Sequence, residues 1–255
     1  MAGTVGAPQL DEASGLVAGT SDPSILWTHN DDGDGVLFGL SRDGAVMGTL
    51  SLSGIDPVDW ESIAATTARG LPELLVGDIG DNDAVRDSIS LLVTAEPSGL
   101  DGEQSAGLVE RITVTLPDGP VDAEAMVVDP STGRLLVFTR DAERSVVYAV
   151  DWSGGGQTAA ERVAELDLDA PPFESLGAIR AADVGTDGSV VLRLTDGAVW
   201  FPGSGSVLDA LNGTGCSVPT PDEADGEGVA FLGRDLYFLG EGANPSLWQV
   251  ARSQP

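Results

Sequence analysis

Lysine is absent from this chain of 255 residues: all 12 of its cationic side chains are arginine, against 41 aspartates and glutamates. The formal net charge is −29. A surface of this sign repels the phosphates of nucleic acids and of anionic membranes, so we expect neither as a partner. Without lysine, Schiff-base catalysis and a P-loop phosphate site are excluded.

Thiols and imidazoles are almost absent too, since Cys216 and His29 each stand alone. One cysteine allows no disulfide within the chain and no zinc site built from several thiolates. One histidine excludes zinc sites that need two or more imidazoles. No apolar run approaches 18 residues, so the sequence predicts no membrane span. Metal binding by this chain would therefore use oxygen ligands.

Turn-forming residues are abundant, with 34 glycines and 15 prolines. Short apolar and β-branched runs alternate with them, and Asp-Gly pairs such as Asp43-Gly44 and Asp187-Gly188 indicate hairpins. Only 159–162 and 206–211 are predicted to be helical. The pattern indicates an all-β chain.

A weak repeat orders these strands into five units. In each unit an acidic residue is followed by small or apolar residues, a turn, an apolar run and a further strand. The leading acids are Glu12, Glu61, Glu124, Asp183 and Glu227. Their spacing suits propeller blades of about 40–50 residues, with insertions at 97–107 and 153–159 in the two longest intervals. We predict a single β-propeller domain of five blades over 1–255, with a sandwich with irregular loops as the alternative.

The predicted blades span 10–55, 56–119, 120–169, 176–212 and 223–253. The last blade has only three strands of its own. Residues 3–7 have extended character, so we expect this N-terminal segment to supply the fourth strand. Closure of this kind covers sheet edges that would otherwise invite aggregation.

The first strand of each propeller blade lines the central channel, so the five leading acids are predicted to form a ring there. In three units an aspartate lies two residues earlier, on the same strand face (Asp59, Asp122 and Asp225). Converging carboxylates repel one another unless a cation neutralises them. Hard oxygen ligands suit Ca²⁺ first, then Mg²⁺ or Mn²⁺. The alternative is that these acids cap strand ends.

Two acidic loops follow the second strands of the first two blades. The candidate ligands are Asn30, Asp32 and Asp34 in the first loop, and Asp78, Asp81 and Asn82 in the second. The first loop has the spacing of a calcium loop but departs from the EF-hand, because its twelfth position is Ser41. The alternative is a pair of Asx-rich turns.

Two residues are weak candidates for a catalytic base. His29 has an ordinary pKa suited to proton transfer near neutrality, and Asp78 follows a strand that ends at the predicted metal face. A lone histidine at a strand end more commonly holds a loop by hydrogen bonding. No Gly-x-Ser-x-Gly elbow is present, so a serine hydrolase of that class is unsupported.

Several motifs together resemble a family of mostly uncharacterised bacterial β-propellers. The matching segments are His29-Asn30-Asp31-Asp32-Gly33, Asp59-Trp60-Glu61-Ser62-Ile63-Ala64, Gly77–Asn82, Asp122-Ala123-Glu124-Ala125 and Gly226-Glu227-Gly228-Val229-Ala230. Asp32 stands where the family has serine, and Ser62 where it has a third acid. The layout is also similar to the SdiA-regulated five-bladed propellers and, more distantly, to calcium-dependent propeller lactonases and phytases.

The resemblance implies an extracytoplasmic, calcium-associated propeller, secreted or attached to the cell envelope. A cytoplasmic location stays open, because residues 1–9 lack the basic and apolar regions of a signal peptide. The first functional hypothesis is a monomeric binding or structural module for an unknown ligand or cell-envelope partner. The alternative is a metal-dependent hydrolase of a lactone or phosphoester.

Overall fold

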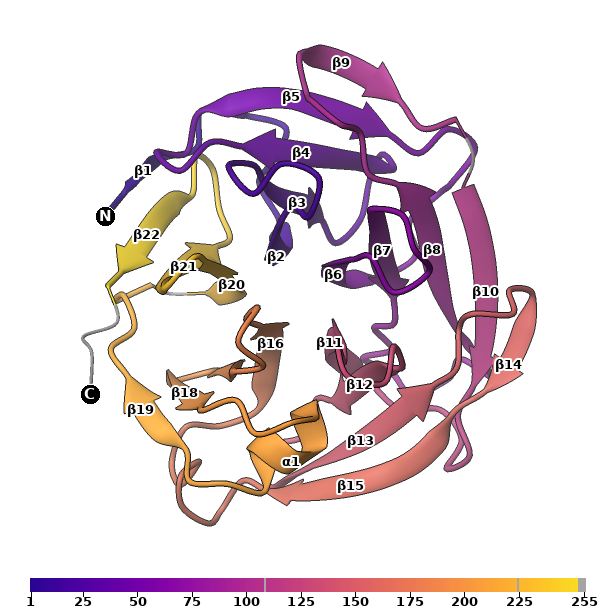
Figure 1. Cartoon of the computed structure of the whole chain (residues 1–255), viewed down its shortest axis with the longest axis vertical. Helices are drawn as coiled ribbons and strands as arrows, with labels where there is room; N and C mark the ends of the chain where they lie inside the picture. Colours follow the sequence, from indigo (N-terminus) through magenta and orange to yellow (C-terminus); the bar gives the residue numbers. More distant parts are fainter. Residues whose placement is uncertain (108, 224, 252–255) are drawn as a thin grey trace.

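The computed structural model describes residues 1–107, 109–223 and 225–251, and in this part of the chain five β-sheets form a closed ring (Figure 1). The fold is a five-bladed β-propeller, as the repeat predicts. Within each blade the chain starts at the centre and moves outward strand by strand. The innermost strands are β2 (Ala13–Ala18), β6 (Trp60–Thr66), β11 (Ala123–Val128), β16 (Ile179–Val184) and β20 (Gly226–Leu232).

The outer strands complete antiparallel sheets in chain order. The first blade adds β3 (Leu26–Asn30), β4 (Val36–Leu40) and β5 (Val46–Ser51), and the second adds β7 (Glu73–Asp78), β8 (Ile89–Ala95) and β10 (Val109–Thr115). The third adds β12 (Leu135–Thr139), β13 (Arg144–Val150) and β15 (Glu161–Asp167). The fourth adds β17 (Val190–Leu194), β18 (Gly197–Phe201) and β19 (Cys216–Val218), and the fifth adds β21 (Asp235–Gly240) and β22 (Ser246–Val250).

The ring is closed by the N-terminal strand β1 (Gly3–Thr4), which confirms the predicted closure. It pairs antiparallel with β22, and Gly3 lies opposite Leu247. The predicted last blade also included Ala224 and residues 252–253, which lie outside the described residues.

Both insertions fold back as a fifth strand on the outer edge of the preceding blade (Figure 1). Strand β9 (Gly102–Ser105) pairs parallel with β5, and β14 (Gln157–Ala159) pairs parallel with β10. The predicted helix over 159–162 is therefore wrong: these residues end β14 and begin β15, where pairing with β13 outweighs a weak helical tendency. The helix α1 (Val207–Leu211) does form and is capped by Ser206, and β19 carries the fourth sheet beyond residue 212.

Apolar side chains between adjacent sheets hold the blades together. Trp27, Trp60 and Trp152 are fully buried in these layers, and Phe138 and Phe201 share one such layer between the third and fourth blades. Burial of large side chains stabilises the ring by about 1.5–3 kcal/mol each. Among the described residues no helix has the length and apolar character needed to cross a membrane. The rigid ring fixes the five inner strands around one axis.

Candidate cation-binding face

Four of the inner strands contain a β-bulge at one shared position near their start. The extra residue is Glu61 in β6, Glu124 in β11, Arg180 in β16 and Glu227 in β20. A bulge re-aims its side chain and increases the local twist. We call the end of the channel where the five inner strands begin the mouth face. Three glutamates and one arginine therefore occupy the bulges at this face.

The ring predicted from the sequence is wrong in two blades. In β2 the register shifts later, between Ser14 and Val17, and Glu12 lies before the strand, where it is exposed. In β16 the bulge residue is Arg180, so Asp183 lies three residues farther along the strand. Each repeat begins with an acidic residue, but the position of the bulge decides which side chain points toward the channel.

Arg180 connects the glutamates of the two neighbouring blades. Its Nη1 lies 3.2 Å from Glu227 Oε1 and 3.6 Å from Glu124 Oε2. The other oxygen of Glu124 pairs with Arg140, which also lies 3.7 Å from Asp122. Arg140 and Arg180 thus supply part of the positive charge that a cation would provide in the predicted ring.

Among the described residues, no arginine forms such an ion pair with Glu61. Burial raises its pKa to about 10, helped by the charges of Glu124, Asp59 and Glu227, so the carboxyl keeps its proton at neutral pH. Burial also raises the pKa of Asp59. A Cβ on Gly80 would lie 2.4 Å from the Asp59 carboxyl carbon and 2.8 Å from Glu61 Oε1. Gly80 in the Gly-Asp-Ile-Gly-Asp-Asn motif therefore leaves room for a carboxyl pair.

Only one carboxylate oxygen of Glu227 lies in an ion pair with Arg180. Burial raises its pKa to about 7 although Arg180 opposes the shift. Its Oε2 is buried and has no hydrogen-bond partner among the described residues. An unpaired buried carboxylate oxygen is costly, which is consistent with the raised pKa.

Asp183 ties two blades together instead of facing the mouth. Its Oδ2 accepts a 2.7 Å hydrogen bond from the backbone N–H of Phe231 in β20. Complete burial raises its pKa to about 7. This geometry matches the alternative in which an acid satisfies a strand donor.

His29 is fully buried, with its ring edge-on to Trp60 at a centroid distance of 5.6 Å. Its Nδ1 lies 2.9 Å from the Asn30 carbonyl oxygen. Burial lowers its pKa to about 4. A histidine in this environment is neutral at physiological pH and packs within the first two blades.

The second acidic loop is held by its own side chains. Asp78 forms a 2.7 Å ion pair with Arg86, and the carboxylate of Asp81 accepts a 2.8 Å hydrogen bond from the Arg86 backbone N–H. Asn82 Oδ1 accepts from Arg140 at 3.1 Å. Protein groups thus occupy Asp78, Asp81 and Asn82, and the backbone donor to Asp81 supports the turn alternative for that residue.

The first loop uses Asn30 in a similar way. Its Nδ2 donates to the Gln9 carbonyl at 2.7 Å, and its Oδ1 accepts from the Glu12 backbone N–H at 3.3 Å. Asp34 is exposed at the tip of the loop. Asn30 thus holds Glu12 beside the end of β3.

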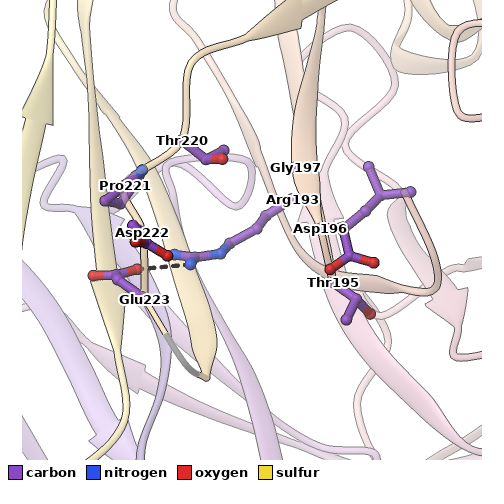
Figure 2. A pocket seen from close by; sticks show the side chains of 9 residues that line it. Arg193, Thr195, Asp196, Gly197, Thr220, Pro221, Asp222 and Glu223 are labelled. Atoms are coloured by element: carbon purple, nitrogen blue, oxygen red, sulfur yellow. Dashed lines mark hydrogen bonds and ion pairs between the residues drawn. The ribbon is translucent and has the colours of Figure 1, made fainter. Parts of the chain in front are cut away.

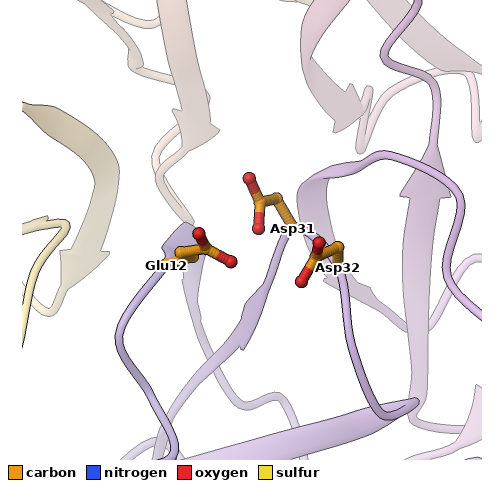
Figure 3. A group of neighbouring side chains, drawn as sticks. All are labelled: Glu12, Asp31 and Asp32. Carbon is orange, nitrogen blue, oxygen red and sulfur yellow. The ribbon is translucent and has the colours of Figure 1, made fainter.

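Glu12, Asp31 and Asp32 point toward one another at the mouth face (Figure 3). One carboxylate oxygen from each lies within 4.8 Å of the others, and among the described residues this is the one such group. The charges of Asp31 and Asp32 raise the pKa of Glu12, and burial raises that of Asp31. Asp31 Oδ1 is buried, and no residue in the described part of the chain forms a hydrogen bond with it.

This group contains two predicted ligands and one that the sequence analysis missed. The alternating spacing of a calcium loop selects Asn30, Asp32 and Asp34, and it skips Asp31. The signal for Asp31 is its place directly after β3, where its backbone N–H donates to the Glu12 carbonyl at 3.1 Å. Three carboxylates with no nitrogen or sulfur ligand fit Ca²⁺.

The sequence matches no protein-family model and has no match among curated proteins. Solved structures of similar fold include the major Malassezia sympodialis allergen Mala s 1, with a TM-score of 0.58 at 9% identity, covering 97% of this chain and 94% of that chain. A glucose dehydrogenase has a TM-score of 0.52 at 9% identity over 98% and 99% of the two chains. A gluconolactonase from Xanthomonas campestris has a TM-score of 0.49 at 12% identity over 95% and 88%. At such identities the likeness concerns the fold alone.

Proposed function

We propose that this propeller is a binding module whose mouth face holds a divalent cation, Ca²⁺ before Mg²⁺ or Mn²⁺, at Glu12, Asp31 and Asp32. The convergence of three carboxylate oxygens within 4.8 Å carries the proposal. Without a cation the three groups repel one another, as the raised pKa of Glu12 indicates. A bound cation removes this repulsion and is coordinated by the unpartnered Asp31 oxygen.

The same geometry suggests how a partner is recognised. Ca²⁺ takes six to eight oxygen ligands, and three carboxylates leave positions for water or for oxygen atoms of a ligand. Glu12 and Asp32 are exposed, so a ligand or cell-envelope partner can reach the ion. The module acts as a monomer in this proposal.

An exposed site with three carboxylates suits the weak, millimolar affinity of extracellular calcium modules. We propose that the protein is secreted or attached to the cell envelope. Calcium there would reach the concentrations needed to fill such a site.

A second candidate function rests on the Asp59–Glu61 pair. Glu61 retains a proton at neutral pH because its pKa is raised to about 10, and it lies beside an aspartate at the mouth of the channel. In such a pair Glu61 could donate a proton to the leaving oxygen of a bound ester while Asp59 accepts one from the attacking water, so a metal-dependent lactone or phosphoester hydrolase remains the alternative. Turnover by the wild type that is lost in Glu61→Gln would support it.

The test of the cation proposal is calorimetric titration of the chelator-treated protein with Ca²⁺, beside its Tm with and without the ion. We expect saturable binding and a higher Tm, because an ion that binds only the folded state stabilises it. Glu12→Gln and Asp32→Asn should each weaken Ca²⁺ binding by roughly tenfold through loss of a charged ligand. Asp101→Asn, an exposed charge change on the insertion of the second blade, is the matched control. Equal affinity in all four proteins, or no binding heat, would contradict the proposal.

A further inference from the structure

The N-terminal segment closes the ring with more than the short strand β1. Residues 2–12 lead from β1, at the outer edge of the fifth blade, to β2 at the centre of the first blade (Figure 1). The Val5 N–H donates to the Pro245 carbonyl at 2.8 Å. Three buried side chains of the segment share one apolar cluster with both blades: Val5, Ala7 and Leu10, with Leu239 and Leu247 of the fifth blade and Leu26 and Phe38 of the first. We call the contact between residues 2–12 and the fifth blade the closing seam.

The acidic group at the mouth face lies at the inner end of this seam. The Asp11 carbonyl accepts a 2.9 Å hydrogen bond from the Gly242 N–H, in the turn between β21 and β22. The next carbonyl, that of Glu12, accepts from the Asp31 N–H at 3.1 Å, and the Asp31 carbonyl accepts from the Trp60 N–H of the second blade at 2.8 Å. Consecutive residues therefore bond to the fifth and the first blade. A displacement of Glu12 from Asp31 also displaces the Asp11 carbonyl from Gly242.

Repulsion between carboxylates acts at this same point. Glu12, Asp31 and Asp32 each place a carboxylate oxygen within 4.8 Å of the others (Figure 3). Glu241, next to Gly242, adds a carboxyl group from the fifth blade: burial raises its pKa, and so does the charge of Asp31. Without a cation, these like charges push apart groups that the closing seam brings together.

The contact between the fourth and fifth blades is held by opposite charges instead. Arg193 reaches across it (Figure 2), pairs with Glu223 at 2.7 Å and donates to the Gly228 carbonyl at 3.0 Å. Its guanidinium is buried. This contact needs no ion for its charge balance, whereas the closing seam contains the repulsion between Glu12 and Asp31.

We propose that a cation bound at Glu12, Asp31 and Asp32 locks the closing seam, so that cation binding and closure of the ring are coupled. This inference rests on the proposed function. With the ion bound, Glu12 stays against the end of β3 and Asp11 presents its carbonyl to Gly242. After loss of the ion the seam opens more often, while the second to fourth blades keep their packing. Local opening of this kind is measured by amide hydrogen exchange.

The test compares amide hydrogen exchange of the full chain in Ca²⁺ and in chelator. The reporters are the amides of Val5 and Gly242, which donate across the seam. The controls are the amides of 136–138 in β12, which lies between β11 and β13 in the third blade. At about ten times the Kd, an ion that binds only the closed form lowers the open population by about tenfold. Exchange at the reporters should therefore slow by about this factor relative to the controls.

Glu12→Gln separates relief of the repulsion from binding of the ion. Glu12 is exposed, so the variant should fold. In chelator, removal of this charge should slow exchange at the reporter amides severalfold relative to the wild type. Added Ca²⁺ should then change the exchange less than it does in the wild type. Asp101→Asn should behave like the wild type in both conditions.

The outcomes separate this inference from the cation proposal. If calorimetry shows Ca²⁺ binding but reporter and control amides respond equally, the locking role is overturned and the cation site stands. If Ca²⁺ does not bind, the cation proposal fails. Slower reporter exchange of Glu12→Gln in chelator would then still support coupling of the acidic group to closure, and unaltered exchange would overturn it.

Discussion

Among the bulge residues of the mouth face, Arg180 differs most from the others. Three inner strands carry a glutamate at the bulge, while β16 carries this arginine between two of those glutamates. Its guanidinium therefore acts as a covalently attached counter-charge for Glu124 and Glu227. Its charge lowers the pKa of both buried acids against the effect of burial, together with Arg140 at Glu124.

Arg180→Ala should destabilise the protein because Glu124 and Glu227 lose that counter-charge. Loss of one partner of a buried ion pair costs about 3–5 kcal/mol, and partial exposure of Arg180 lowers the expected cost to roughly 2–3 kcal/mol. Thermal or urea unfolding measures the effect. Arg180→Lys keeps the charge and should recover most of the loss. A Tm of Arg180→Ala equal to that of the wild type would show that the pairs contribute little.

Asp183 should make stability depend on pH. Its pKa is about 7 in the folded protein against 3.8 for the ordinary side chain, so the folded state holds its proton while the unfolded chain releases it. The contribution of Asp183 to the free energy of unfolding therefore falls as pH rises from about 4 to 7, by about 1.4 kcal/mol per pH unit at most.

The Asp183→Asn variant isolates this effect, because its amide oxygen can still accept from the Phe231 N–H. The Tm of the variant minus that of the wild type should increase between pH 4.5 and 7.5, then level off. Both proteins are measured in chelator so that cation binding does not contribute. A difference that stays constant over this range would mean that Asp183 ionises normally in the fold.

At the scale of elements, the two insertions protect sheet edges. Strand β14 lies parallel to β10 and covers its outer side, with Thr158 opposite Val114. A strand edge without such a cover presents unpaired N–H and C=O groups that invite pairing with another chain. Thr158→Pro removes a backbone donor from β14 and should leave the fold intact while β10 becomes exposed.

We expect Thr158→Pro to lower the Tm by only a few degrees but to increase aggregation on heating, followed by light scattering. Gly99→Pro, which changes the chain in the other insertion outside β9, is a control for the introduction of proline. Unchanged scattering would indicate that β14 has no protective role.

The sequence predicts the elements better than their register. Apolar runs and turns identify the blades, because both signals are local. The position of a bulge depends on how one strand pairs with the next, and this is why Glu12 and Asp183 were assigned to the ring and Arg180 was not. The sequence pattern does not indicate Asp31 as a ligand for a similar reason, since its approach to Glu12 depends on pairing between β2 and β3.

At the scale of the whole molecule, the net charge of −29 causes more repulsion in some regions than in others. Many carboxylates form turns or pair with the few arginines, as Asp78 and Glu124 do. The repulsion that remains unrelieved concentrates at the mouth face, at Glu12 and Glu61. The proposed cation site follows from this excess of negative charge on one face.

The pairing of β1 with β22 also has a consequence for biosynthesis. The residues of β1 leave the ribosome before the other strands of the ring, and those of β22 leave only after four blades and most of the fifth. The earlier blades can collapse against one another while translation continues, but the ring stays open until its last strand emerges. During that interval the edge of β1 and the flank of the first blade have no partner, so the risk of misassembly is greatest until β22 has been synthesised.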